Sequence, residues 1–364
     1  MPQSGTVVRQ RTMSGLVRER VARRGVRYVT PVSPARATGL VAAVYDQMRR
    51  EFAIVPPLTL HSPIPELLAG VWAVTREAYV VDPAGRAQRE ALATAVSQAN
   101  SCPFCVEVHS IMARAAGGMI PAEASASVFP LDPPSSADPL VAWGGATRSP
   151  RLLREHPQPF PDAKVPAMYG TAVLFHYINR MVNVFLEPSP MPAAVRFARA
   201  VVGRVVAMTV GRGLVRVDAR PGLAVGLEEG AVAPPEFGWA AAAPPVARAL
   251  ATLASASAQA GEATLPGAVR ELARETLARW EGDDPGLGRA WLDAAVAALA
   301  SARERAAAVL VLLTALASYR VDAAVVGSFR THFPDDRDLV AATAWTSFEA
   351  TRRIASWLGA AGGA

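Results

Sequence analysis

The sequence predicts an all-α protein built from two copies of one helical unit. Apolar residues recur at spacings of three and four along most of the chain, which is the period of one helix face, and alternating β-branched runs are scarce. Segments near the ends of the two halves resemble each other, which indicates a duplication. The 364 residues suffice for two cores without metals or crosslinks, because a domain takes roughly 150 residues.

The helices of the first half are bounded by proline and glycine. Proline favours the first helical turn and glycine a helix end, so these residues mark where helices begin and stop. The expected helices are 40–48, followed by a stop near Pro56, then 66–79, 87–98, 103–116 and 169–186. Ten prolines between Pro121 and Pro166 predict a loop-rich insertion at 120–166, since proline removes a backbone donor.

The second half is predicted to be a shorter copy. Its expected helices are 246–260, 268–280, 288–300, 304–318 and 339–358, and residues 201–227 could form a short strand pair or a loose helix. We therefore divide the chain into a partly disordered basic arm (1–34), a helical domain (35–195), a connector (196–245) and a degenerate helical repeat (246–364).

Two offsets relate the copies. Residues 171–186 match residues 343–358 at an offset of 172, whereas Arg89-Glu90 resembles Arg303-Glu304 at an offset of 214. The second copy is thus about 42 residues shorter between the two markers, which is close to the length of the Pro-rich insertion. We expect the insertion in the first copy alone and no cysteine in the second, where Tyr319 and Arg320 stand near the corresponding position.

Composition argues against several classes of partner. The net charge is +6, but Lys164 is the one lysine among 37 basic residues, so the arginine excess reflects compositional bias and no nucleic-acid partner is expected. The longest apolar run, 306–317, is shorter than the ~20 residues that span a bilayer, so no membrane association is expected. The N-terminus lacks the apolar core of a secretory signal, and we expect a cytoplasmic protein.

Both cysteines lie in one short motif, Cys102-Pro-Phe-Cys105, and His109 follows. Pro103 indicates that a helix begins here, with Ser101 or Cys102 at its cap. Residues three and four apart share a helix face, so Cys102, Cys105 and His109 form one stripe. The two cysteines are close enough for a disulfide, but the loop it would close is too short to stabilise the fold, so the pair is expected to be redox-active.

Glu90 precedes Cys102 by twelve residues, which is about 18 Å along one straight helix. We therefore expect the chain to break near Asn100 and Ser101, so that the helix of Glu90 packs beside the cysteine helix. Glu90 could then reach His109 directly or through a water molecule, and His109 could accept the proton of Cys105, whose thiolate is the reactive form.

These four positions resemble the AhpD-like, or carboxymuconolactone decarboxylase, superfamily. Its alkylhydroperoxidase branch has a glutamate twelve residues before Cys-x-x-Cys, then three residues and a histidine; Glu90, Cys102, Cys105 and His109 match. The resemblance implies that Cys105 attacks an organic hydroperoxide, that Cys102 resolves the product into a disulfide, and that Glu90 and His109 relay protons. Some members have a second histidine between the cysteines, where this chain has Phe104.

The resemblance also implies the partners. We expect a thiol-dependent peroxidase without cofactor or metal, re-reduced by a dithiol or a protein thiol, and assembled as a homo-oligomer such as a trimer with hexamer-like symmetry. A zinc site at Cys102, Cys105 and His109 would lack a fourth ligand. A non-catalytic structural or interaction protein and a carboxymuconolactone decarboxylase-like enzyme remain alternatives. His176 and Tyr177 are expected to pack between helices.

Overall fold

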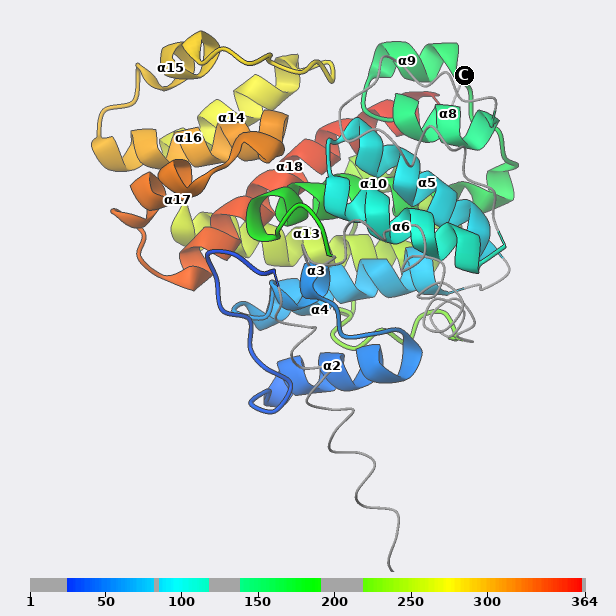
Figure 1. Cartoon of the computed structure of the whole chain (residues 1–364). Coiled ribbons are helices and arrows are strands. Elements are labelled where there is room, and N and C mark those ends of the chain that lie inside the picture. The colour runs from blue at the N-terminus through cyan, green and yellow to red at the C-terminus, as the bar shows by residue number, and fades with distance from the viewer. Residues whose placement is uncertain (1–24, 82–84, 118–137, 191–218, 362–364) are drawn as a thin grey trace, which may run out of the picture.

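The computed structural model describes residues 25–81, 85–117, 138–190 and 219–361 (Figure 1). Within these residues the regular structure is helical, apart from one antiparallel bridge between Val26 and Leu186. The all-α prediction is therefore confirmed. None of the described helices is long and apolar enough to cross a membrane.

The helices of the first half lie close to their expected positions. They are α2 (Gly39–Glu51), α3 (Pro56–Thr59), α4 (Pro65–Val74), α5 (Arg86–Ala99), α6 (Pro103–Ala115), α8 (Pro139–Ala146), α9 (Pro150–Glu155) and α10 (Val165–Phe185), with a 3₁₀ turn η3 (Asp162–Lys164). One departure matters for the site: after α4 the chain continues as a π-helix, η1 (Thr75–Val80). The expected helix over 66–79 is present as α4 together with η1, but the change of helix type after Val74 was not predicted.

The prediction of a loop-rich insertion is wrong for the part that the structure describes. Residues 118–137 of the insertion lie outside the described residues, but α8 and α9 occupy much of the rest. Pro139 and Pro150 are the first residues of these helices, where the missing N–H would have no intrahelical partner. Here the prolines begin helices rather than prevent them.

The second half contains η6 (Pro235–Ala242), α13 (Pro244–Thr264), α14 (Gly267–Arg279), α15 (Ala290–Val296), α16 (Ala302–Ala317), η7 (Ser318–Arg320), α17 (Ala323–Arg330) and α18 (Asp336–Ala361). The sequence did not predict α17, whose first turn is capped by the Asp322 carboxylate. Residues 219–227 form turns, so the expected strand pair or loose helix is wrong there, and residues 191–218 lie outside the described residues.

Two long buried helices organise the bundle. In Figure 1, α10 and α18 lie in the middle, with α14 to α17 on one side and α5, α6, α8 and α9 on the other. α10 packs on η1 and α5, and α18 packs in the same way on α13 and α16. The halves meet where α10 contacts α18 and where α4 contacts α13. This repeated packing is the arrangement that a duplication predicts, and the domain boundaries stay a prediction.

Close helix contacts at these junctions depend on small residues. A Cβ atom at Gly261 on α13 would lie 2.2 Å from Cδ1 of the buried Trp345 on α18. A Cβ atom at Gly70 on α4 would lie 2.9 Å from the Leu253 backbone on α13. Because interiors are close-packed, neither position has room for a methyl group unless a helix moves.

We expect Gly261→Ala to lower the free energy of unfolding by roughly 1–3 kcal/mol, because the new methyl group would overpack the α13–α18 contact. Gly327→Ala on α17 is the control, since its Cβ meets nothing within 4 Å. It should stabilise the fold by about 0.5–1 kcal/mol through better helix propensity. Urea unfolding of the full chain measures both, and equal effects of the two substitutions would contradict the described packing.

Candidate active site

A sharp turn between α5 and α6 brings the site residues together. α5 ends at Ala99, and Ser101 adopts the left-handed conformation with φ of 52°. The Ser101 N–H donates to the Gln98 carbonyl and the Cys102 N–H to the Ser97 carbonyl, at 3.0 and 2.9 Å. The expected break near Asn100 and Ser101 is present, and α6 folds back to pack along α5.

As a result of this turn, Glu90 on α5 contacts His109 on α6 directly. His109 Nδ1 lies 2.8 Å from Glu90 Oε2, and the carboxylate is fully buried while the imidazole side chain is 15% exposed. The edge of the His109 ring meets Phe175 of α10, with ring centroids 4.6 Å apart. The His109 imidazole therefore lies between the Glu90 carboxylate and the Phe175 ring.

The second oxygen of Glu90 is held by a residue that the sequence analysis did not single out. Arg86, one turn earlier on α5, donates from Nε to Glu90 Oε1 at 2.7 Å, and both side chains are buried. Burial by itself would raise the pKa of Glu90, but the charge of Arg86 and the hydrogen bonds from His109 and Tyr79 outweigh it and lower the pKa to about 2. Glu90 is therefore ionised at neutral pH.

Tyr79 was also missed. Its hydroxyl lies 3.0 Å from His109 Nδ1 and is hydrogen-bonded to Glu90, while the guanidinium of Arg86 covers its ring at 4.1 Å. Burial raises the pKa of Tyr79 well above its usual value, so the phenol stays protonated. Tyr79 lies in the π-helix η1, a type of segment that is frequent at functional sites. The residue spacing in the sequence indicated neither the π-helix nor the contact of Tyr79 with His109.

Both cysteines are buried at the start of α6. Cys102 is the residue before the first helical turn, and Cys105 lies within that turn, one helical turn before His109. Burial raises the pKa of Cys102 well above its usual value, and the neighbouring Cys105 thiol raises it further, while the Asn179 side chain lowers it. Cys102 therefore remains a thiol at neutral pH.

A buried polar network supports the turn from the side of α10. Asn100 Nδ2 donates to Asn179 Oδ1 and to His176 Nδ1, each at 3.0 Å, and Asn179 Nδ2 donates to the Ser97 hydroxyl. His176 Nε2 contacts the Thr147 hydroxyl, and burial followed by the charges of two nearby arginines lowers the pKa of His176 well below its usual value. The prediction that His176 packs between helices is confirmed.

The corresponding region of the second half is arranged differently. Glu304, at the position related to Glu90, is partly exposed and caps the start of α16 together with Ser301. The Tyr319 hydroxyl donates to Asp284, and Arg320 donates to carbonyl groups of residues 286–288. These side chains hold a surface loop and form no second carboxylate–histidine contact.

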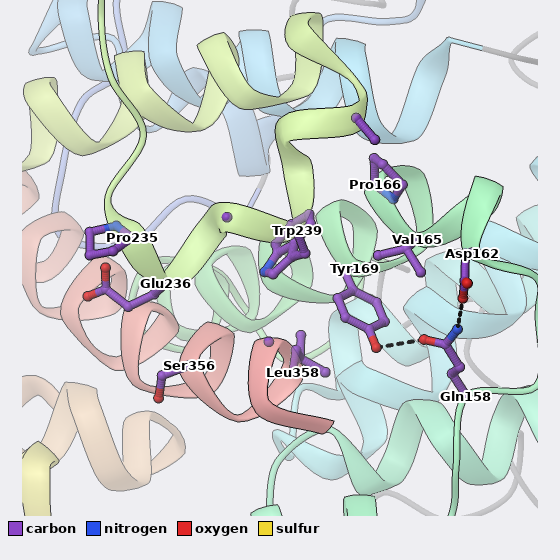
Figure 2. Close-up of a pocket in the computed structure, with 13 residues that line it drawn as sticks. Gln158, Asp162, Val165, Pro166, Tyr169, Pro235, Glu236, Trp239, Ser356 and Leu358 are labelled. Atoms are coloured by element: carbon purple, nitrogen blue, oxygen red, sulfur yellow. Dashed lines mark hydrogen bonds between the residues drawn. The ribbon is translucent and has the colours of Figure 1, made fainter. Parts of the chain in front are cut away.

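A separate pocket of about 610 Å³ lies between α10, η6 and α18 (Figure 2). Tyr169 and Trp239 line it, and the Tyr169 hydroxyl donates to Gln158, whose amide donates to Asp162. None of the four predicted site residues lines it. Among the residues that the structure describes, no group of three or more Cys, His, Asp or Glu side chains could hold a metal ion.

We expect Glu90→Gln to lower the free energy of unfolding at pH 7 by on the order of 3 kcal/mol, since one pKa unit corresponds to about 1.4 kcal/mol. The pKa of Glu90 lies below its ordinary value of 4.5, so the ionised carboxylate stabilises the fold above that pH and the contribution is lost as the pH falls to about 2. The difference in the free energy of unfolding between the variant and the native chain should therefore shrink over this pH range in urea unfolding.

Glu155→Gln, at an exposed ion pair with Arg151, is the control. A difference that does not change with pH would contradict the assignment.

The chain is similar to known proteins over nearly its whole length. The model of the carboxymuconolactone decarboxylase family matches residues 65–126, which include Glu90, both cysteines and His109. A Mycobacterium tuberculosis protein named alkyl hydroperoxide reductase is 35% identical over 340 residues, which are 92% of this chain and 96% of that protein. No solved structure matches the chain. With the all-α fold, these similarities show that the chain belongs to the AhpD-like, or carboxymuconolactone decarboxylase, superfamily.

Proposed function

We propose that the protein is a thiol-dependent peroxidase that reduces organic hydroperoxides through a dithiol–disulfide cycle of Cys102 and Cys105. The observation that carries the proposal is the contact at 2.8 Å between the buried Glu90 carboxylate on α5 and His109 on α6, the helix that begins at the two cysteines. The relative named alkyl hydroperoxide reductase supports the same class of reaction. A purely structural role would give no reason to bury an ionised carboxylate against an imidazole that lies one helical turn after Cys105.

In the first step, the Cys105 thiolate attacks the terminal oxygen of the hydroperoxide. The S–O bond forms, the O–O bond breaks, and the alkoxide leaves with a proton as an alcohol, so Cys105 becomes a sulfenic acid. His109 takes the proton of the Cys105 thiol before the attack and supplies it to the leaving oxygen, which is general base and then general acid catalysis. Glu90 stabilises the imidazolium that forms between the two events.

In the second step, the sulfur of Cys102 attacks the Cys105 sulfenic acid. The S–S bond forms, the S–O bond breaks, and the oxygen leaves as water after accepting a proton. Burial keeps Cys102 protonated until this point, because it raises the pKa of that thiol. An external dithiol or protein thiol then reduces the disulfide by thiol exchange, and the reductant becomes the oxidised product.

The assignment of the two thiols rests on their positions. Cys105 lies within the first turn of α6, where the helix dipole favours a negative charge, and one turn before His109. Cys102 lies before that turn, in contact with the Asn179 side chain. We therefore assign the attack on peroxide to Cys105 and the resolving step to Cys102.

We expect Cys105→Ser to abolish hydroperoxide consumption, with a loss of at least about 100-fold, because a serine hydroxyl is not ionised at neutral pH. Cys102→Ser should stop turnover with a dithiol but still allow one equivalent of peroxide to be consumed, leaving a sulfenic acid on Cys105. Consumption of cumene hydroperoxide with dithiothreitol measures the first effect, and mass spectrometry after dimedone labelling measures the second.

Ser257→Ala is the control, since its hydroxyl is buried in α13 away from the site and has no hydrogen-bond partner. Unchanged peroxide consumption in Cys105→Ser would rule out the cysteine cycle. If Cys102→Ser keeps full activity and no sulfenic acid is detected, the roles assigned to the two thiols are wrong.

A further inference from the structure

Glu90 receives a separate donor on each oxygen. Arg86 Nε donates to Oε1 at 2.7 Å, and His109 Nδ1 lies 2.8 Å from Oε2. Glu90 and Arg86 are both almost completely buried, with side chains 0% and 3% exposed. Because water cannot reach this carboxylate, its partners decide which proton arrangement it accepts.

This arrangement fixes which nitrogen of His109 carries the proton. Two lone pairs at 2.8 Å would repel each other, so an ionised Glu90 requires the proton on His109 Nδ1. The Tyr79 hydroxyl donates to Glu90 and presents its oxygen 3.0 Å from the same nitrogen. The Nδ1–H group is thus enclosed by two acceptors, and Nε2 keeps a free lone pair on the opposite side of the ring.

We propose that Arg86 and Tyr79 are positioning residues that hold His109 in the tautomer with the proton on Nδ1, so that Nε2 is the proton acceptor of the site. The proposal rests on the proposed peroxidase function for its catalytic consequence. Arg86 acts through Glu90, whose charge it balances, and through Tyr79, whose ring it covers at 4.1 Å and whose backbone carbonyl it contacts. Tyr79 acts through its hydroxyl. Neither residue is assigned a contact with the peroxide.

The groups around the imidazole are few and come from four helices. Tyr79 faces it from η1 and Glu90 from α5, with Arg86 and Arg89 behind them, and Cys105 precedes it on α6. From α10 the neighbouring ring is Phe175, which does not titrate. Among these described groups, Arg86 is the cation that contacts Glu90 directly and lowers its pKa most strongly against the effect of burial.

Arg86→Gln tests the proposal because it removes the charge and keeps a donor. Without the guanidinium, burial favours a proton on Glu90, and as long as Glu90 stays ionised its charge attracts a proton to His109 without competition from Arg86. The Glu90–His109 pair should then take up a proton at higher pH. We expect the acid limb of the pH–kcat/KM profile for peroxide to move upward by about one unit or more, and kcat/KM at pH 7 to fall at least tenfold. Arg86→Lys should restore most of the loss.

The tautomer itself is measured without reference to activity. Ring ¹⁵N NMR of the histidines, with His109 assigned by His109→Asn, should give a protonated Nδ1 and an unprotonated Nε2 in the reduced native chain at pH 7. Arg86→Gln and Tyr79→Phe should each shift His109 toward the Nε2–H or the doubly protonated form. The other four histidines should not change.

Two control variants separate these effects from a loss of fold. Arg76→Gln breaks an equally buried ion pair with Glu77 that does not contact His109. Tyr177→Phe removes a buried hydroxyl that has no hydrogen-bond partner. Both should leave the His109 signals and the acid limb in place. Should Arg86→Gln fail to fold, Tyr79→Phe carries the same measurements.

An Nε2–H tautomer in the native chain would overturn the proposal. The proposal is also wrong if Arg86→Gln and Tyr79→Phe change neither the tautomer of His109 nor the acid limb of the pH–kcat/KM profile. A native chain that consumes no hydroperoxide would instead refute the proposed function, while the NMR measurement would still decide whether Arg86 and Tyr79 fix the tautomer. The two failures are therefore distinguishable.

Discussion

The site depends on one turn of the backbone. Glu90 and the cysteine motif are too far apart to meet on a straight helix, and the left-handed residue Ser101 reverses the chain so that α6 lies against α5. A non-glycine residue in this conformation costs roughly 1–2 kcal/mol. The surrounding hydrogen bonds offset this cost: Asn100 is held through its side chain by α10, and its carbonyl accepts from Asn183 at 3.1 Å. The geometry of the candidate site is thus maintained by polar side chains of α10 that contact the turn.

The same region contains several buried cations, which are balanced in two different ways. Arg86 is balanced by a carboxylate, Glu90. Arg148 and Arg180 donate to carbonyl groups at the ends of two helices, Arg148 to Ala99 of α5 and Arg180 to Ala315 of α16, and Arg148 also lies 3.9 Å from the Asp284 carboxylate. The C-terminal ends of helices carry partial negative charge and unpaired carbonyls, so these arginines serve as caps. Burial and the neighbouring charge of Arg148 lower the pKa of Arg180 to about 9, and it remains positively charged at neutral pH.

The sequence was sufficient for the features that depend on spacing. Helix period, proline positions and the twelve residues between Glu90 and Cys102 predicted the helices, the break and the carboxylate–histidine contact. It was insufficient where contacts join distant segments. Tyr79 reaches the site from a π-helix that packs against α10, and the apolar pattern of the sequence does not distinguish this helix type from an α-helix. Asn179 and His176 were visible as polar residues in a helix, but their role depends on where α10 crosses the turn. Prolines were misinterpreted because the same residue ends one helix and begins another.

Asn183 joins the turn before the cysteines to the second half of the chain. Its side-chain amide donates to the Asn100 carbonyl in the first half and to the Ser318 hydroxyl in the second, at 3.1 and 3.0 Å. The turn that precedes the cysteines and the turn at the corresponding place in the second half are therefore tied to one side chain. Any movement of the turn before the cysteines must therefore either break a hydrogen bond of Asn183 or be passed on to the second half.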